Sequence, residues 1–389
     1  MLPLLALAAA NATERIIYHS SQTPGYTAWV GLWSMPSGEV MTNFVEAKGQ
    51  WPMNASFSFP VLATSNGAEW TAPSKPVVGY SRGVAVMPGG LTMVRPALTF
   101  GSDTIAFGPV GCDKQVNKDG SVGYCHTQYS HGDFNGVEIS TDGGLTWGGV
   151  TYLASQQEVS KCIVTRIKAL RDGRLVAVLG LKHRDGTSGD VLHHMAVGTF
   201  VDNTTVVWEK PILTLPPKFG TCEESDLVEL PNGTLFFMHR AVSCPHPGPN
   251  CKAPPYENHI QSLVLRNRDG SFSPQPPTTT FLNYEFPCMV LTRKGNVLLH
   301  IQASGSRYSR DFGASWADLK HTAVAGGAIF TTHYYPRAVE TADGTIVVTS
   351  HNSGDDAYMP RWPNGSLAIG SPFLVDQHIW AQTFRLVPA

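Results

Sequence analysis

Six short hairpin turns recur along the chain, and this repeat constrains the fold more than any other feature of the sequence. Each copy consists of an apolar strand, a tight turn centred on glycine and a second apolar strand. The turn glycines are Gly38, Gly89, Gly173, Gly233, Gly295 and Gly344. Asn-Gly and Asp-Gly turns supply the positive φ angle that two-residue hairpins need. Units of roughly 60 residues fit blades of four strands with long connecting loops, so the pattern predicts an all-β, six-bladed β-propeller.

The interval from Gly89 to Gly173 is the longest between these turns, at 84 residues. It holds either a long insertion, formed by the loop between Cys112 and Cys125, or a degenerate seventh blade. We therefore expect six blades and keep seven as the alternative. The composition agrees with many short strands, because 38 Gly and 28 Pro residues disfavour long helices and only 15% of the residues are charged.

Charge, hydropathy and motif content exclude several classes of partner. The 28 Lys and Arg residues nearly balance the 30 Asp and Glu residues, so no basic surface for nucleic acid is expected. No interior apolar run is long enough to span a bilayer, so no transmembrane segment is expected. The sequence has no C-x-x-C pair, no H-E-x-x-H motif and no EF-hand loop, so we expect neither a metal nor a cofactor.

The first residues resemble the end of a secretory signal peptide. Residues 1–12 are interpreted as a short or truncated signal segment, because the apolar run Leu2–Ala10 ends in small residues; an edge strand is the alternative. We assign residues 13–389 to one β-propeller domain. Five N-x-[ST] sequons favour a secreted or lumenal protein over a cytoplasmic one, although two of them are also natural turn sequences. They are Asn11, Asn54, Asn203, Asn232 and Asn364.

The seven cysteines divide into two loop-flanking pairs and three single residues. Cys112 with Cys125, and Cys244 with Cys251, each flank a loop that a disulfide would staple in an oxidising compartment. The remaining three are expected to be buried small hydrophobes at strand positions. These are Cys162, Cys222 and Cys288.

A second motif, S-x-D-x-G-x-[ST]-W, occurs at residues 140–147 and 309–316, with a weakened copy at residues 266–272. In such a turn the Asp caps backbone N–H groups, the Gly takes the left-handed conformation and the Trp packs the turn against the next strand. This motif is the Asp box, and through it the chain resembles the sialidase superfamily of six-bladed propellers over about residues 15–387. In that family the box is structural, so it identifies the fold and not the chemistry.

The strand ends that face the mouth of such a propeller carry an excess of arginine. The innermost strand of each blade starts at the central mouth and the next strand ends there, so positions about seven to nine residues from each hairpin glycine converge. Those positions are Trp29, Arg82, Arg95, Arg166, Glu224, Arg240, Phe286, Pro287, Gln302, Tyr335, Arg337 and His351. Guanidinium groups match a planar carboxylate, so we predict an acidic sugar as the ligand. The alternative for any single arginine is a loop cap or an ion pair with a nearby acid.

Residues 222–240 are the closest local match to the sialidases. The resemblance implies that Glu224, or its neighbour Glu223, is the base that polarises a tyrosine, and that Arg240 binds the substrate carboxylate. Tyr335 resembles the catalytic tyrosine of the family. A phenol has an unperturbed pKa of about 10, so it needs an adjacent carboxylate and local positive charge to act as a nucleophile near neutral pH.

The likeness extends to Arg307, which falls about where the family's third arginine lies. Two other parts of the family pattern are different here. The residues Thr27–Val30 stand where the family has Arg-Ile-Pro on its first inner strand, and the first Asp of the chain is Asp103, too late for the family's general acid. Glu46 and Glu69 are the acidic residues available as substitutes.

Three functions are compatible with these residues. The first is a sialidase-like exo-glycosidase, in which Tyr335 and Glu224 attack the anomeric carbon of an acidic sugar while Arg240 and Arg307 hold its carboxylate. The second is a polysaccharide lyase that cleaves next to a uronic acid by β-elimination, with an acid and a base drawn from His and Tyr. The candidates at the rim are His131, His193, His194, His333, His351, Tyr334 and Tyr335, although an isolated strand histidine is otherwise structural.

The third function is a non-catalytic glycan-binding propeller, with Trp29 and Trp362 as stacking platforms. The expected partner is the same in all three cases, a glycan that contains sialic acid or a uronic acid. The sequence favours the exo-glycosidase, because packing alone does not account for Glu224, Arg240 and Tyr335 together.

Overall fold

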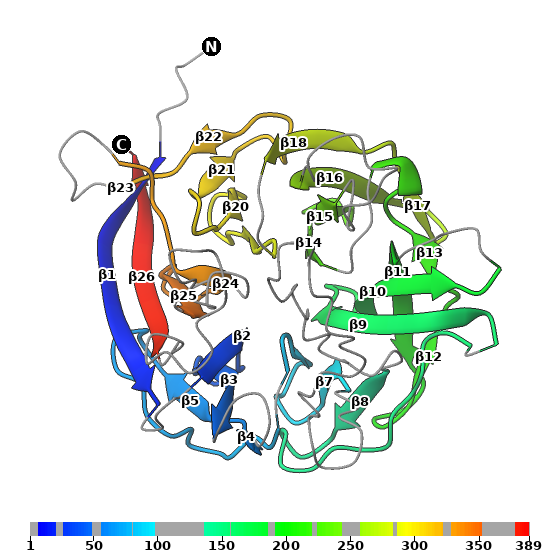
Figure 1. Cartoon of the computed structure of the whole chain (residues 1–389), viewed down its shortest axis with the longest axis horizontal. Coiled ribbons are helices and arrows are strands. Elements are labelled where there is room, and N and C mark those ends of the chain that lie inside the picture. The colour runs from blue at the N-terminus through cyan, green and yellow to red at the C-terminus, as the bar shows by residue number, and fades with distance from the viewer. Residues whose placement is uncertain are drawn as a thin grey trace, which may run out of the picture.

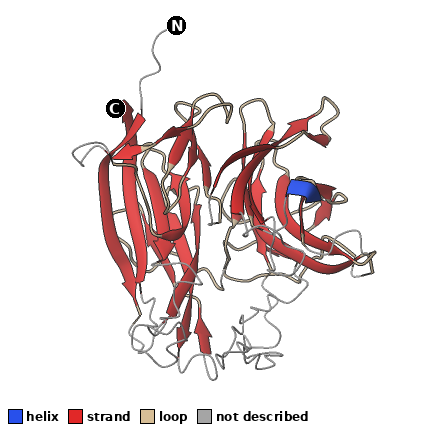
Figure 2. Ribbon diagram, turned by 45° about the horizontal axis from the view of Figure 1, so that its top comes forward, coloured by secondary structure: helices blue, strands red, loops and turns tan. Residues whose placement is uncertain are grey.

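The chain forms a ring of six β-sheets around a central axis (Figure 1). The computed structural model describes residues 7–20, 26–48, 56–79, 81–97, 136–155, 157–185, 191–219, 224–242, 257–282, 286–321, 328–351 and 378–388. In this part of the chain the helical structure is one short turn, η1 (Pro217–Phe219), and the rest of the regular structure is strand (Figure 2). No helix among these residues is long and apolar enough to cross a membrane. The prediction of an all-β, six-bladed propeller is confirmed.

The first three blades follow the chain in order. The first contains β2 (Tyr26–Ser34), β3 (Val40–Lys48) and β4 (Ser56–Ser58), with β5 (Val61–Thr64) also paired to β3. The second contains β6 (Ala85–Val86), β7 (Met93–Pro96) and β8 (Val137–Ser140). The third contains β9 (Val159–Ala169), β10 (Leu175–His183), β11 (Leu192–Phe200) and β12 (Val206–Trp208), with β13 (Ile212–Leu213) on β11.

The last three blades complete the ring. The fourth contains β14 (Ser225–Glu229), β15 (Leu235–Val242), β16 (Glu257–Arg266) and β17 (Phe272–Pro274), with β18 (Thr278–Leu282) on β16. The fifth contains β19 (Met289–Leu291), β20 (Leu298–His300), β21 (Arg307–Ser309) and β22 (Ala317–Asp318). The sixth runs outward as β24 (Tyr334–Glu340), β25 (Ile346–His351), β26 (His378–Pro388), β1 (Leu7–His19) and β23 (Lys320–His321).

The long interval after Gly89 is an insertion inside the second blade. Strands β7 and β8 pair directly, with Arg95 opposite Glu138, so the chain leaves this sheet and returns to the same sheet. A seventh blade is therefore not required. The Cys112–Cys125 loop that the sequence places there lies outside the described residues.

The two ends of the described chain meet in the sixth blade. Strand β1 pairs antiparallel with β26 over a register from Leu7 opposite Pro388 to His19 opposite His378, and the two strands run side by side in Figure 1. Residues 7–12, which the sequence assigned to a signal segment or an edge strand, lie within β1, and the side chains of Leu7, Ala8 and Ala9 are buried. This pairing is the clasp that closes the ring.

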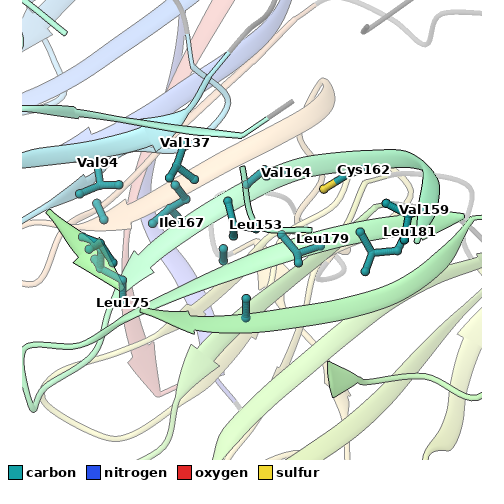
Figure 3. Close-up of a cluster of buried hydrophobic side chains, with 14 residues drawn as sticks. Val94, Val137, Leu153, Val159, Cys162, Val164, Ile167, Leu175, Leu179 and Leu181 are labelled. Atoms are coloured by element: carbon teal, nitrogen blue, oxygen red, sulfur yellow. The ribbon is translucent and has the colours of Figure 1, made fainter. Parts of the chain in front are cut away.

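The apolar core lies between neighbouring blades. One cluster joins the second and third blades through Val94, Val137, Ile167 and Leu175, all buried (Figure 3). Similar clusters join the third blade to the fourth, the fourth to the fifth and the fifth to the sixth. Burying one such aliphatic side chain stabilises a fold by about 1.5–3 kcal/mol, so these seams hold the blades in place around the axis.

The predicted turn glycines join the innermost strand of each blade to the second strand. Five of them have positive φ angles, with values of 89° at Gly38, 93° at Gly89, 86° at Gly173, 83° at Gly233 and 87° at Gly344. In the sixth turn Asn296, with φ 48°, adopts the left-handed conformation in place of Gly295. Asparagine tolerates this region better than most residues, so the turn retains its geometry.

The two S-x-D-x-G-x-[ST]-W loops follow the third strands of the second and fifth blades. In the first loop Ser140 Oγ donates to Asp142 Oδ1 at 2.7 Å, and the backbone N–H of Thr146 donates to the same oxygen at 2.9 Å. Hydrogen bonds from the Thr146 side chain and backbone lower the pKa of Asp142 to about 2. Ser309 and Asp311 repeat this arrangement in the second loop at 2.7 Å. The loops therefore close each blade through an internally bonded turn.

We expect Gly313→Ala to destabilise the protein more than Gly173→Ala. Both glycines have positive φ angles, 92° and 86°, which cost an L-residue roughly 1–2 kcal/mol. A Cβ at Gly313 would also clash with the buried ring of Phe236, whereas a Cβ at Gly173 meets no atom within 4 Å. Overpacking adds about 1–3 kcal/mol. Urea denaturation of the two variants measures the difference, and equal losses would contradict the steric argument.

Candidate active site

The inner ends of the strands place most of the predicted site residues around the axis. Trp29 is on β2, Arg82 precedes β6, Arg166 is on β9 and Glu224 precedes β14. Arg240 is on β15, Tyr335 and Arg337 are on β24 and His351 ends β25. Each of these strands is the first or second of its blade, as the sequence predicts.

Glu224, Arg240 and Tyr335 form a closed triangle of contacts. Arg240 Nη1 donates to Glu224 Oε2 at 2.6 Å and to the Tyr335 hydroxyl oxygen at 3.1 Å. The Tyr335 hydroxyl in turn donates to Glu224 Oε1 at 3.4 Å. Glu224 and Tyr335 are both buried, at 9% and 7% exposed. A tyrosine hydroxyl between a carboxylate and a guanidinium has both a proton acceptor and a positive charge for its anion.

The backbone of Tyr335 is held in an unusual conformation. Its φ angle is 47°, and the pairing of β24 with β25 shifts register between Tyr334 and Arg337. A non-glycine residue in this region costs about 1–3 kcal/mol and persists where the surroundings determine it. The ring of Tyr335 stacks on His351 at 5.7 Å and meets Phe286 edge-on at 6.3 Å. The bulge thus directs the hydroxyl at Glu224 while the rings of His351 and Phe286 fix the side chain.

Trp29 on the first blade also has a left-handed backbone conformation at a register shift. Its φ angle is 53°, and β2 shifts register against β3 between Ala28 and Gly31. The guanidinium carbon of Arg82 lies 5.5 Å from the centre of the Trp29 ring, a cation–π distance. The indole of Trp29 is therefore buried beside a cation.

Arg166 and Arg337 form a second cationic group around Phe286. Their guanidinium carbons lie 4.8 Å and 4.3 Å from the centre of that ring. Burial, together with the neighbouring positive charge of Arg166, lowers the pKa of Arg337 to about 9. The acid beside this group is Asp226, 3.4 Å from Arg166 Nε and also 2.8 Å from Lys168 Nζ. One carboxylate therefore faces several cations.

The arginines differ in how their charge is compensated. Arg240 is paired with Glu224, and Arg307 lies on the third strand of its blade with its Nε 3.5 Å from Asp318 Oδ1. Arg166 pairs with Asp226, but its Nη2 is buried without a hydrogen-bond partner, as is Nε of Arg337. A buried cation with unused donors is costly unless an anion is close to it.

The remaining predicted residues fall into two groups. Arg95 caps its own blade, because it pairs with Glu138 at 2.9 Å and covers the Trp147 ring at 3.8 Å. His333 pairs with Glu14 at 3.3 Å away from the triangle of contacts on Tyr335. Glu223, His131 and Trp362 lie outside the described residues.

The two glutamates considered as general acids occupy opposite ends of the first blade. Glu46 is near the end of β3, the strand that returns to the mouth, and accepts hydrogen bonds from Ser20 at 2.7 Å and Ser58 at 2.9 Å. Glu69 is exposed and lines a cavity beside the hairpin turn at Gly38. Position therefore favours Glu46.

Asp226 is a site residue that the sequence reasoning missed. A signal for it was present, because residues i and i+2 of a strand share a face and Asp226 stands two positions after Glu224. Its carboxylate also accepts the backbone N–H of Met289 at 2.8 Å, which ties the fourth blade to the fifth. The described residues contain no group of three metal-ligating side chains placed to hold a metal ion.

Cys162 and Cys288 are buried with free thiols, as predicted for small hydrophobes. Burial raises the pKa of Cys162 to about 12 and that of Cys288 to about 11, so neither is a nucleophile. The two proposed disulfide pairs and Cys222 lie outside the described residues.

Comparison with known proteins gives structural matches only. No protein-family model matches the chain, and no curated protein matches it. It is similar over 98% of its length to all of a protein of unknown function from Dyadobacter fermentans, with 14% identity and a TM-score of 0.57. It is also similar to the α-L-arabinofuranosidase of Fusarium graminearum in complex with arabinobiose, with 11% identity, a TM-score of 0.58 and coverage of 96% of this chain and 97% of that one.

A third similar structure is the NanB sialidase from Streptococcus pneumoniae, with 10% identity and a TM-score of 0.58. The match covers 95% of this chain and 70% of that chain. At these identities the matches establish the fold, a six-bladed β-propeller, and leave the chemistry to be argued from the residues.

Four buried histidines outside the triangle are held neutral. Burial lowers the pKa of His193 to about 3 and that of His194 to about 4. The pKa values of His239 and His300 also lie well below 6.5, first through burial and then through neighbouring histidines.

These depressed pKa values predict a protein that loses stability in acid. A histidine with a lowered folded-state pKa binds a proton more readily when unfolded, so stability is full above pH 6.5 and falls as the pH drops below it. Each such histidine contributes a limiting slope of about 1.4 kcal/mol per pH unit. Urea denaturation at pH 7 and pH 5 tests this, and His194→Gln should reduce the slope. Equal free energies of unfolding at both pH values would refute the interpretation.

Proposed function

We propose that this protein is a glycoside hydrolase that removes terminal acidic sugars, in the manner of the sialidases. The observation that carries the proposal is the triangle formed by Tyr335, Glu224 and Arg240 within 3.4 Å. A tyrosine gains nucleophilic character when a carboxylate takes its proton and a cation stabilises the phenolate. The similar structures, a sialidase and an α-L-arabinofuranosidase, support a carbohydrate substrate, since both are enzymes named for the sugars on which they act.

The reaction proceeds by two displacements at the anomeric carbon. Tyr335 attacks that carbon as its proton passes to Glu224 Oε1, and the bond to the leaving oxygen breaks with protonation by a general acid, for which Glu46 is the better-placed candidate. In the second step water attacks the glycosyl-tyrosine intermediate and gives a proton to the deprotonated general acid, while Glu224 returns its proton to the departing phenol. Arg240 stabilises negative charge on the phenol oxygen in both steps.

The acidic group of the sugar is bound first by arginines that have unused donors, although one of them, Arg166, also pairs with Asp226. Arg166 and Arg337 have buried donors without hydrogen-bond partners, and Arg82 with Trp29 adds a cationic and aromatic wall. Arg240 and Arg307 keep the assignment that the resemblance gives them, as arginines on the substrate carboxylate. A bidentate carboxylate would pair with the donors left open on Arg166 and Arg337.

One observation favours a second candidate, a polysaccharide lyase. The His351 ring stacks on Tyr335 at 5.7 Å, which brings two groups able to exchange protons next to the buried arginines. A lyase would abstract the proton beside a uronate carboxylate and expel the glycosidic oxygen without using water. Non-catalytic glycan binding is the third outcome that an assay must separate. A secreted or lumenal location is proposed together with these functions, and the sequons at Asn203 and Asn232 lie in exposed turns.

Turnover should appear on an acidic glycan and depend on the triangle. The purified protein is incubated with a sialoside, a uronic-acid polysaccharide and a neutral glycan, and the products are identified by mass. We expect a free acidic sugar with uptake of water, and a loss of at least about 10³-fold in kcat for Tyr335→Phe and Glu224→Gln. Tyr152→Phe, at an exposed tyrosine, is the matched control. An unsaturated uronate would instead identify a lyase, and binding without product would leave a lectin-like role.

We expect Arg337→Met to weaken binding of an acidic sugar without destabilising the fold. Removing a buried, poorly compensated charge is expected to leave the free energy of unfolding unchanged or to raise it by about 1 kcal/mol. The affinity for an acidic sugar should fall at least about tenfold, because a charge-assisted hydrogen bond is lost. Arg266→Met, at a partly exposed ion pair with Asp172, is the control. Unchanged affinity for the acidic sugar in Arg337→Met would contradict the assignment.

A further inference from the structure

A chain of buried hydrogen bonds runs directly behind Glu224 and Arg240. His193 Nδ1 lies 2.8 Å from Ser225 Oγ, which lies 2.8 Å from His239 Nδ1, and His239 Nε2 lies 2.8 Å from Ser262 Oγ. None of these four residues is more than 2% exposed. The histidine–serine chain, as we call these four residues, starts on β11 of the third blade and crosses β14, β15 and β16 of the fourth.

Ring contacts and a neighbouring histidine pair extend this polar layer. The rings of His193 and His239 are 4.8 Å apart, and Phe237 stacks on His239 with an interplanar angle of 5°. His259 Nδ1 lies 3.0 Å from His300 Nε2, which joins the fourth blade to the fifth. The layer therefore connects the third, fourth and fifth blades and includes residues of β14, which begins after Glu224, and of β15, which contains Arg240.

The histidine–serine chain and the triangle use opposite faces of the same two strands. Ser225 follows Glu224, His239 precedes Arg240, and successive side chains of a strand point to opposite faces. Ser225 and His239 are direct register partners, and the next rung is the hydrogen bond from the Arg240 backbone N–H to the Glu224 carbonyl at 2.9 Å. Any shift of Ser225 or His239 is transmitted to Glu224 and Arg240 within one residue.

The hydrogen bonds of this chain are all compatible with neutral imidazoles. A neutral imidazole has one donor and one acceptor nitrogen, and a serine hydroxyl can donate and accept, so Ser225 can bridge His193 and His239 while Ser262 bonds the other nitrogen of His239. A buried network of this kind fixes the positions of its members.

We propose that His239, with Ser225 and Ser262, holds β14 and β15 in place. This sets the distance between Glu224 and Arg240, and hence the position of the Tyr335 hydroxyl. The effect on catalysis rests on the proposed function, whereas the structural effect on the two strands does not. Groups that orient reacting residues from behind are typically worth about 10- to 100-fold when removed. Ser225 and His239 touch no substrate, so they are positioning residues.

Two variants of the same histidine test which link matters. In His239→Asn the shorter amide reaches the place of Nδ1 and keeps the bond to Ser225, whereas in His239→Gln the longer amide reaches the place of Nε2 and keeps only the bond to Ser262. We expect kcat within about threefold of wild type for Asn, and a loss of about 10- to 100-fold for Gln with KM little changed. Ser225→Ala removes the central hydroxyl with little change of volume and should behave like His239→Gln.

A matched control separates positioning from general stability. His194→Gln alters a histidine of similar burial that bonds only to its own strand, at Leu192 O. It should lower the melting temperature to a similar extent without a selective loss of kcat. The proposal is overturned if His239→Asn and His239→Gln lose kcat equally. It is also overturned if the kcat of Ser225→Ala is the same as that of His194→Gln.

A measurement without substrate keeps the proposal independent of the assay. Hydrogen exchange of the segment 224–242, followed by mass spectrometry, reports opening of the β14–β15 rung that carries Glu224 and Arg240. Exchange there should accelerate at least about tenfold in Ser225→Ala and not in His194→Gln. Unchanged exchange would sink the positioning role even if the enzyme is active. If exchange is faster in Ser225→Ala but the wild-type protein shows no turnover, the positioning role is supported and the proposed function is rejected.

Discussion

The antiparallel pairing of β1 with β26 closes the ring, and the candidate site depends on that closure. Tyr335 and Glu224 are 111 residues apart in the chain and belong to the sixth and fourth blades. Their side chains meet because all six inner strands are held at fixed angles around one axis. The strand of Tyr335 lies in the same sheet as β26 and β1, so opening of the clasp would disturb the blade of Tyr335 first.

Inside the ring, the arginines differ in how completely their donors are paired. Arg95 has an acid beside it on its own blade, and such a pair needs no ligand. Arg166 and Arg337 share the ring of Phe286 and have buried donors without partners. An interior arranged in this way is less stable than an apolar one of the same volume. The net charge of −2 conceals this concentration of positive charge.

The parts of this structure that sequence could predict are those encoded locally. Turn glycines report the left-handed conformation directly, so Gly38 and its counterparts located every inner hairpin, and counting from them found Tyr335, Glu224 and Arg240. Spacing from the turn glycines does not distinguish Arg95, which caps a loop, from Arg166, which does not. The partners that decide this come from other strands. Arg307 was placed by resemblance, and its position on a third strand beside Asp318 has no local signature.

The features that escaped prediction are those created by contact between blades. The histidine–serine chain joins His193 to Ser225 across a blade boundary, and nothing in either strand marks the other as its partner. The left-handed conformations of Trp29 and Tyr335 are equally unmarked, because neither residue favours that region by itself. Both occur at a register shift on an inner strand, in two blades of the same ring. An extended strand directs its side chains across the sheet, so a bulge is a direct way to turn an aromatic ring toward the axis, and backbone strain is the cost of that orientation.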